Sequence, residues 1–251
     1  MNDPQTRHVI ALSGGKDSTA MALRLHELHP NREYIRVVTP TGDELPDMYA
    51  HWRRLADMLG PLTVVTADTT LDGLIDRHKM LPNFQARWCT RQLKIEPYQA
   101  WILRHTPAVS YVGLRADEEN RPGMEFRELS GVDLRFPMQE WGWSLSEVLA
   151  YLERKGIEIP KRTDCGSCFF QTLGEWWGLW KDHRDKFDEY AAKEREISEI
   201  RGKKCTLRSD GRDSWPADLA SLAIEFEKGN TPKGADQTDL FKRARCRVCS
   251  M

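Results

Sequence analysis

The sequence has no long hydrophobic run and almost no net charge. None of its 251 residues belongs to an apolar stretch long enough to cross a bilayer, and the polar residues 1–7 do not resemble a signal peptide. These absences predict a soluble, cytoplasmic protein with no membrane partner. A chain of this length can bury a hydrophobic core, as one large domain or as a domain of ordinary size with an appendage.

The formal net charge of −1 hides an uneven distribution. Residues 201–251 carry 11 Lys and Arg against 7 Asp and Glu, whereas residues 1–200 carry 26 against 31. Four of the C-terminal cations lie close together, at Lys242, Arg243, Arg245 and Arg247. This basic tail is either a contact for nucleic acid or a solvated chain end, and the sequence leaves both open.

A Walker A loop is also missing, because no glycine stands at the required spacing before a Gly-Lys pair. The chain has instead a glycine-rich segment, Ser13 to Thr19, with the sequence Ser-Gly-Gly-Lys-Asp-Ser-Thr. An apolar run, residues 8–12, precedes it, and apolar residues at helical spacing follow it. This pattern predicts a strand, a tight loop and a helix.

The glycine-rich segment has the chemistry of a phosphate site. Its glycines let the backbone approach an anion, and the N–H groups and dipole at the helix start favour negative charge. Lys16 supplies a cation for a leaving pyrophosphate, and Asp17 either holds Mg²⁺ or caps the helix. The expected nucleotide contacts are Ser13, Gly14, Gly15, Lys16, Asp17, Ser18 and Thr19. The alternative is a glycine turn whose serines and aspartate cap an ordinary helix.

Strands and helices alternate after this loop. Strands are expected at residues 34–39, 62–66 and 109–114, with helices at 46–59 and 71–80. This order predicts an α/β fold, in which a parallel sheet has helices on both faces. Ligands of such sheets bind beyond the carboxyl ends of the strands.

The character of the chain changes near residue 160. We assign residues 1–160 to the nucleotide-binding α/β domain. Residues 161–251 form a C-terminal helical region that holds the cysteine pairs and the basic tail. One long amphipathic helix is expected in this region, from Glu175 through Ile197.

Two further segments follow strand ends and therefore border the same expected pocket. Thr41 and Gly42 form a turn after the second strand, and Arg115 follows the fourth, with Asp117 and Arg121 nearby. Thr41, Gly42 and Arg115 are therefore further expected nucleotide contacts. The planar fork of an arginine suits phosphate or sulfate oxygens. A simple turn and a surface arginine are the alternatives.

Six cysteines are present, four of them in two Cys-x-x-Cys pairs separated by 77 residues. In a reducing cytosol such pairs indicate metal or redox chemistry rather than disulfides. Cys89 stands at an expected helix start among Arg87, Arg91 and Lys94, a setting that predicts a lowered thiol pKa. The alternative for Cys89 is a buried cysteine with basic surface neighbours, and Cys205 is expected to be a free thiol.

The segment Ser13 to Thr19 resembles the pyrophosphatase loop of the PP-loop ATP pyrophosphatases. Members of that superfamily split ATP between the α and β phosphates and leave AMP on a substrate oxygen. Three further strings resemble the phosphoadenosine phosphosulfate (PAPS) reductase branch: Thr-Gly-x-Glu-x-Pro at 41–46, Cys-Thr-x-x-Leu-Lys at 89–94 and Gly-x-Arg-x-Asp at 113–117. The resemblance implies an adenine nucleotide alpha hydrolase-like fold, ATP and Mg²⁺ as cofactors, and catalytic roles for Lys16, Asp17 and Arg115.

The first cysteine pair is similar to an element of phage and bacterial members of this branch. A Cys-x-x-Cys-Pro-Phe string precedes a tryptophan-containing helix there, and residues 165–170 match it except that Phe169 replaces the usual proline. Relatives often end with a cysteine followed by two residues, as this chain does at Cys249.

Five thiols are well placed for a four-thiolate site. We expect a [4Fe–4S] cluster, whose ligands come from distant segments: Cys89, Cys165, Cys168 and Cys249, with Cys246 as the alternate for the last. Zinc (Zn²⁺) is an alternative, although structural zinc pairs usually lie closer together in sequence. A protein with no metal is the other alternative.

Three hypotheses for function follow. The leading one is an enzyme that adenylates an oxygen on a nucleobase, a nucleic-acid phosphate or a small molecule, after which a sulfur nucleophile displaces AMP. It resembles tRNA thiolation and DNA phosphorothioation enzymes, so its partners are a nucleotide substrate, nucleic acid at the basic tail and a sulfur donor protein.

The second is a PAPS or adenylyl-sulfate reductase, but the Glu-Cys-Gly-x-His segment and paired-cysteine motif of those enzymes are missing. The third is a non-catalytic protein that binds nucleotide and nucleic acid around a structural metal.

Overall fold

The computed structural model describes residues 6–118 and 129–233, and every structural statement below concerns those residues. Five parallel strands form one sheet in the order β3-β2-β1-β4-β5. The strands are β1 (Arg7–Ala11), β2 (Tyr34–Val38), β3 (Leu62–Val64), β4 (Ala108–Tyr111) and β5 (Val132–Arg135). The prediction of a parallel sheet is confirmed. The edge strand β5 was not predicted, because its exposed Asp133 and Arg135 leave only a short apolar pattern.

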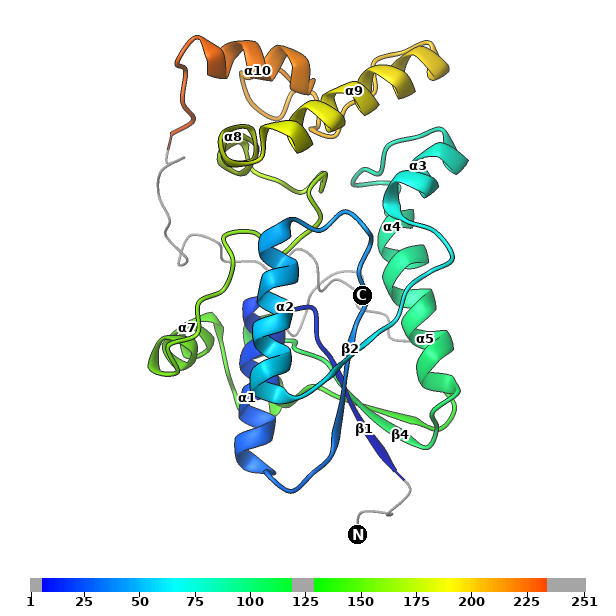
Figure 1. Cartoon of the computed structure of the whole chain (residues 1–251), viewed down its shortest axis with the longest axis vertical. Helices are drawn as coiled ribbons and strands as arrows, with labels where there is room; N and C mark the ends of the chain where they lie inside the picture. The colour runs from blue at the N-terminus through cyan, green and yellow to red at the C-terminus, as the bar shows by residue number, and fades with distance from the viewer. Residues whose placement is uncertain (1–5, 119–128, 234–251) are drawn as a thin grey trace.

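Helices cover both faces of the sheet (Figure 1). On β1, the fully buried neighbours Val9 and Ile10 point to opposite faces and belong to two hydrophobic clusters. The Ile10 cluster includes α1 (Lys16–Leu28), α2 (Pro46–Leu59) and α7 (Leu145–Arg154), and the Val9 cluster includes α5 (Glu96–Leu103). The shorter elements are α3 (Leu71–His78), α4 (Trp88–Thr90), the π-helical η1 (Arg91–Ile95), the 3₁₀ turn η2 (Ala116–Glu118) and α6 (Pro137–Glu140). None of the described helices is long and apolar enough to span a membrane.

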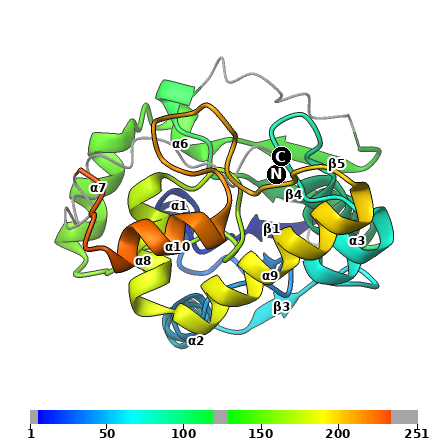
Figure 2. The same cartoon turned by 90° about the horizontal axis from the view of Figure 1, so that it is seen from above.

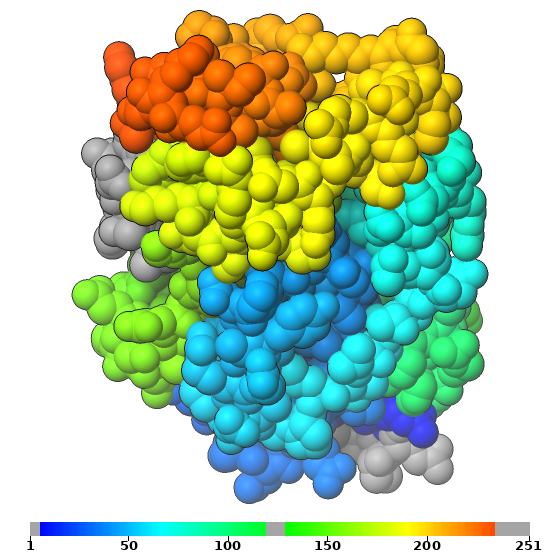
Figure 3. Space-filling model, turned by 45° about the horizontal axis from the view of Figure 1, so that its top comes forward, coloured from blue at the N-terminus to red at the C-terminus, as the bar shows by residue number. Residues whose placement is uncertain are grey.

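Three C-terminal helices lie over the carboxyl ends of the strands (Figures 1 and 2). They are α8 (Leu173–Asp182), α9 (Arg184–Arg201) and α10 (Leu219–Glu227). Their buried side chains share one hydrophobic cluster with α3 and with Leu45 in the turn after β2. Figure 3 shows this layer packed closely on the segments below it. The C-terminal helices therefore cover the end of the sheet at which ligands are expected.

The prediction of one helix from Glu175 through Ile197 is wrong, because the chain breaks at His183 into α8 and α9. His183 has φ −141° and ψ 56°, outside the helical range. The break brings the rings of Trp176 and Phe187 within 6.4 Å of each other in the shared cluster. Apolar spacing alone does not show such a break, since it continues with nearly the same period on both sides.

A buried glutamate fastens the long loop between α9 and α10. The two oxygens of Glu194 accept hydrogen bonds from the backbone N–H groups of Leu207 and Leu219, each at 2.7 Å. Burial raises the pKa of Glu194 to about 7, although these two hydrogen bonds oppose the rise. Glu194 thus acts as a buried acceptor that holds two separate backbone segments.

Replacing Glu194 by glutamine is expected to lower the free energy of unfolding by about 1–3 kcal/mol, because an amide has one acceptor oxygen and leaves one buried N–H unsatisfied. The exposed Glu199 on the same helix provides the control Glu199→Gln, for which little change is expected. The unfolded chain loses the Glu194 proton near the ordinary pKa of 4.5, before the folded chain does. Wild-type stability in urea should therefore fall as pH rises from about 4.5 to 7, and less so in Glu194→Gln. Equal urea midpoints for Glu194→Gln and Glu199→Gln would contradict the role given to Glu194.

Candidate functional site

The glycine-rich loop joins β1 to α1 and is closed by its own serines. Ser13 Oγ and Ser18 Oγ are 2.9 Å apart, and Gly14 N donates to Ser18 Oγ at 3.1 Å. The indole N–H of Trp52 on α2 donates to the carbonyl oxygen of Ser13 at 3.1 Å. Gly15 is the N-cap and makes no side-chain capping hydrogen bond, so the helix N-terminus is available to an anion. The alternative in which Asp17 caps this helix is wrong.

Gly14 is required by both conformation and space. Its φ is +82°, and a Cβ at this position would lie 2.3 Å from Met48 Cε and 2.6 Å from Trp52 Nε1. A side chain would therefore force the loop away from α2. The loop needs glycine here because the backbone passes directly against that helix.

Gly14→Ala is expected to weaken nucleotide binding by at least about tenfold, since positive-φ strain of roughly 1–3 kcal/mol combines with the clash against α2. Gly142→Ala is the matched control, because Gly142 also has positive φ (+66°) and a Cβ there meets nothing within 4 Å. Calorimetric titration with ATP, together with thermal unfolding, measures both effects. Equal nucleotide affinity in the two variants would contradict the importance of the loop shape.

Asp17 and Arg115, both predicted to be catalytic, form a buried ion pair. Arg115 Nη1 donates to Asp17 Oδ2 at 3.0 Å, and its Nε donates to Asp117 Oδ1 at 2.8 Å. Arg115 is 1% exposed and Asp17 is 0% exposed. Burial by itself would lower the pKa of Arg115, but the charge of Asp17 and the bond to Asp117 raise it. Arg115 is therefore a fixed cation beside the loop.

The end of β4 reaches the loop closely enough for this pair to form. A Cβ at Gly113 would lie 3.0 Å from both the Cα and the N of Ser18, so a larger residue would push the two backbones apart. Lys16 Nζ lies 3.7 Å from Asp17 Oδ2. The other oxygen, Asp17 Oδ1, is buried with no hydrogen-bond partner in the described part of the chain. Such an oxygen suits the Mg²⁺ predicted from the sequence.

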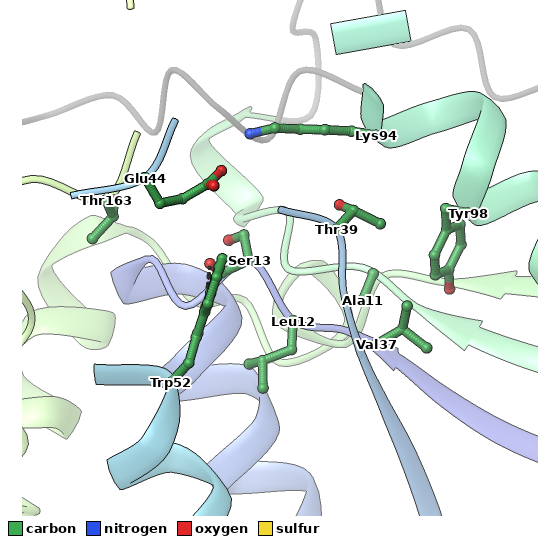
Figure 4. Close-up of a pocket in the computed structure, with 10 residues that line it drawn as sticks. All are labelled: Ala11, Leu12, Ser13, Val37, Thr39, Glu44, Trp52, Lys94, Tyr98 and Thr163. Atoms are coloured by element: carbon green, nitrogen blue, oxygen red, sulfur yellow. Dashed lines mark hydrogen bonds between the residues drawn. The ribbon is translucent and has the colours of Figure 1, made fainter. Parts of the chain in front are cut away.

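A cleft opens beside the loop, beyond the carboxyl ends of β1 and β2 (Figure 4). Its empty space of about 540 Å³ includes volume that is open to solvent. Its lining residues are Ala11, Leu12, Ser13, Val37, Thr39, Glu44, Trp52, Lys94, Tyr98 and Thr163. The cleft thus has an apolar floor, with a hydroxyl, a carboxylate and an ammonium group around its opening.

The sequence interpretation missed several of these residues. Lys94 was predicted only as a neighbour of Cys89, whereas it lines the cleft with Ser13 and Glu44. Its place at the end of the Cys-Thr-x-x-Leu-Lys string could have indicated this role. Trp52 and Thr163 carried no sequence signal, since each reaches the cleft only through the fold.

The Thr41 turn forms the wall between the cleft and the first cysteine pair. Glu44 accepts hydrogen bonds from Thr41 N at 2.8 Å, from Thr41 Oγ1 at 2.8 Å and from Gly42 N at 3.0 Å. Thr41 Oγ1 also lies 3.2 Å from Cys165 Sγ. The predicted nucleotide contacts of Thr41 and Gly42 stay predictions, since the residues of this segment that line the cleft are Thr39 and Glu44.

Asp43 ties the cysteine segment to this turn. Its Oδ2 accepts from Ser167 N at 2.9 Å and from Ser167 Oγ at 2.6 Å, and its Oδ1 accepts from the Tyr190 hydroxyl at 2.6 Å. Burial raises the pKa of Asp43, against these hydrogen bonds. Arg162 holds the segment from the other side, since its Nη2 donates to the carbonyl oxygen of Cys165 at 2.6 Å. Sequence reasoning gave Asp43 and Arg162 no role.

The thiols of Cys89, Cys165 and Cys168 are partly buried. Burial raises the pKa of Cys165 to about 12 and that of Cys168 well above its usual value. The expected low pKa of Cys89 is wrong for the chain alone, because burial raises it more than Lys94 and Arg87 lower it. Buried thiols of this kind are protonated at neutral pH unless a cation replaces the proton.

The described residues contain no group of three or more His, Cys, Asp or Glu side chains that could hold a metal ion. By themselves they do not fit a four-thiolate site. Cys246, Cys249, Arg121 and the basic tail lie outside the described residues, so the predicted ligand set and the nucleic-acid contact of the tail stay predictions. Cys205 forms no disulfide with another described cysteine, and its assignment as a free thiol stays a prediction.

Comparison with known proteins gives one family match and solved structures of related fold. A family model described as the phosphoadenosine phosphosulfate reductase domain matches residues 7–177. The PAPS reductase of Candida auris, solved as a phosphate complex, is 17% identical with a TM-score of 0.50, over 64% of this chain and 77% of that chain. At this identity the likeness shows a shared fold. None of the curated proteins searched matches the sequence.

Two further structures resemble the chain less closely. The U34-tRNA thiolase NcsA of Methanococcus maripaludis, solved with its [4Fe-4S] cluster, is 16% identical with a TM-score of 0.47, over 99% of this chain and 82% of that chain. The NH3-dependent NAD synthetase of Campylobacter jejuni is 14% identical with a TM-score of 0.41, over 92% of this chain and 90% of that chain.

Proposed function

The chain belongs to the family of the phosphoadenosine phosphosulfate reductase domain, within the PP-loop superfamily, and from this premise we propose that it cleaves ATP between the α and β phosphates and adenylates an acceptor. The observation that carries the proposal is the uncapped N-terminus of α1, next to Lys16 and at the edge of the cleft. A helix start of this kind binds phosphate oxygens through its N–H groups and its dipole.

In the proposed reaction, an oxygen of the acceptor attacks the α phosphorus. The bond from that phosphorus to the bridging oxygen breaks, and pyrophosphate leaves with the electron pair. Lys16 and the N–H groups of α1 stabilise the charge that develops on pyrophosphate. Asp17 would hold Mg²⁺ through its Oδ1 atom, and the bound ion would supply neutralisation of phosphate charge. Arg115 holds the Asp17 carboxylate in place through the hydrogen bond from its Nη1 to Asp17 Oδ2.

A sulfur-transfer step completes the proposal. A sulfide-class nucleophile attacks the adenylated centre of the acceptor, and the original oxygen leaves with AMP. The cysteine segment lies beside the nucleotide cleft, because Thr41 contacts Cys165 and Thr163 lines the cleft. Cys89, Cys165, Cys168 and a cysteine outside the described residues remain the proposed ligands of a [4Fe–4S] cluster, although the three described thiols do not by themselves form a group that could hold a metal ion. Zinc is the alternative for the same thiols.

A PAPS or adenylyl-sulfate reductase is the second candidate, and the family match favours it. The two candidates differ in the phosphates that they bind. An ATP pyrophosphatase is expected to bind ATP with Mg²⁺, and inorganic pyrophosphate is expected to displace the bound ATP. A PAPS reductase is expected to prefer adenosine 3′,5′-bisphosphate and an adenylyl-sulfate reductase to prefer AMP, and either is expected to release sulfite from its sulfonucleotide.

Competition calorimetry distinguishes the candidates without knowledge of the acceptor. Displacement of ATP by pyrophosphate, with weak binding of the 3′,5′-bisphosphate, is the result expected for the proposed function. Tight binding of the 3′,5′-bisphosphate together with sulfite release would overturn it in favour of the reductase.

A further inference from the structure

Three phenylalanine rings gather beside the first cysteine pair. The ring of Phe84 lies 5.2 Å from that of Phe169 and 4.8 Å from that of Phe170, in edge-on geometry. Phe169 is 3% exposed, whereas Phe84 is 46% exposed. Phe169, which replaces the proline usual in similar sequences, thus supports an aromatic surface whose outer ring is open to solvent. We call Phe84, Phe169 and Phe170 the aromatic patch.

Arginines border the aromatic patch. The guanidinium of Arg87 lies 5.2 Å from the centre of the Phe170 ring. Arg91 follows one helical turn later with a side chain 65% exposed, and the acidic group beside it is Glu96 at 3.3 Å. The exposed Arg212 donates to the carbonyl oxygen of Gln171, next to Phe170, at 2.9 Å. One cation, Arg87, therefore lies over a ring of the patch, and Arg212 bonds to the backbone next to that ring from a segment far away in the sequence.

The patch is built by the two segments that border the nucleotide cleft. The segment before α5 supplies Phe84 to the patch and Lys94 to the cleft, and the segment before α8 supplies Phe170 to the patch and Thr163 to the cleft. Cys89 and Cys165 lie within these segments and pack against the same hydrophobic cluster. Figure 1 shows both segments at the end of the sheet that the C-terminal helices cover.

We propose that the aromatic patch stacks an unpaired base of a single-stranded nucleic acid and so presents this acceptor to the cleft. This inference rests on the proposed function, of which it names the acceptor class. An exposed ring offers a π face that any base can cover, and neighbouring arginines suit the phosphates on either side of that base. A purely apolar partner would not use these cations, so charge favours nucleic acid over a hydrophobic peptide.

Fluorescence anisotropy with labelled 12-nucleotide oligomers tests the proposal in the full-length protein without ATP. An oligoribonucleotide and an oligodeoxynucleotide with the same base sequence show whether the unpaired base comes from RNA or from DNA. Phe84→Leu keeps an apolar side chain but removes the ring, and it is expected to weaken binding about 5- to 150-fold, whereas Phe84→Tyr keeps the affinity. In Arg212→Ser, the slope of the logarithm of affinity against the logarithm of salt concentration is expected to fall by about one, the amount that corresponds to one lost phosphate contact.

Leu103→Ala is the control, because Leu103 is also an exposed apolar residue (43%) and lies at the far end of α5. Equal affinity of Phe84→Leu and wild type for both oligomers, or no binding by wild type, would overturn the proposal. Pyrophosphate formation from ATP is measured separately on the same samples. Oligomer binding without ATP cleavage would count against the proposed function alone, and ATP cleavage without oligomer binding would count against this inference alone.

Discussion

Lys16→Met is expected to reduce pyrophosphate formation from ATP about 100- to 1,000-fold, the usual cost of removing one charged or hydrogen-bonding group from a developing anion. Lys16 begins α1, its side chain is 11% exposed, and it is proposed to stabilise the leaving pyrophosphate. Methionine keeps the length and apolar contacts of the lysine stem. The loss should therefore appear in turnover, with little change in thermal stability.

The control for this variant is Lys181→Met, since Lys181 is an exposed lysine on α8 whose ammonium lies over the Trp177 ring, outside the lining of the cleft. It should leave pyrophosphate formation unchanged. If Lys16→Met formed pyrophosphate at the wild-type rate, Lys16 would have no role in the proposed reaction. A fall in turnover that matches a fall in melting temperature would show a structural role instead.

Asp17→Asn is expected to lower the free energy of unfolding by about 3–5 kcal/mol, because it removes the fully buried carboxylate that pairs with the buried Arg115 charge. Arg115 would keep Asp117 and Glu118, but its closest buried partner would become neutral. Loss of this pair would also let the end of β4 move away from the loop. Urea unfolding measures the change, and ATP titration is expected to show weaker binding.

Two further variants make the Asp17 prediction specific. Asp117 touches the same guanidinium but is 42% exposed, so Asp117→Asn should cost less than about 1 kcal/mol. Combining Asp17→Asn with Arg115→Met should cost less than the sum of the single changes, since the double variant no longer buries an unpaired charge. Equal effects of Asp17→Asn and Asp117→Asn would mean that burial does not strengthen the pair.

The parts of the site that could be predicted are those whose residues adjoin in sequence. The strand, the loop at Ser13 to Thr19 and the helix after it follow from local apolar spacing and glycine chemistry, and the structure has all three. Strand order and the cover over the sheet end come from side chains that meet only after folding.

Long-range pairings explain the parts that sequence reasoning missed. Arg115 and Asp17 are 98 positions apart, and Asp43 meets Tyr190 across 147 positions. No pattern within one segment indicates such partners. The raised pKa of Cys89 was missed for the same reason, because the apolar side chains that bury it come from distant helices. Basic neighbours in the sequence gave the opposite expectation.

Product analysis with ATP labelled at the α phosphate tests the central claim most directly. The anaerobically purified protein is given labelled ATP, Mg²⁺, a sulfide donor and a pool of single-stranded oligonucleotides, with Lys16→Met alongside. We predict labelled AMP and an equal amount of pyrophosphate from the wild type, and neither from the variant above background. Release of labelled ADP with inorganic phosphate, or no cleavage by a wild-type protein that binds ATP, would contradict α–β cleavage at the Ser13 loop.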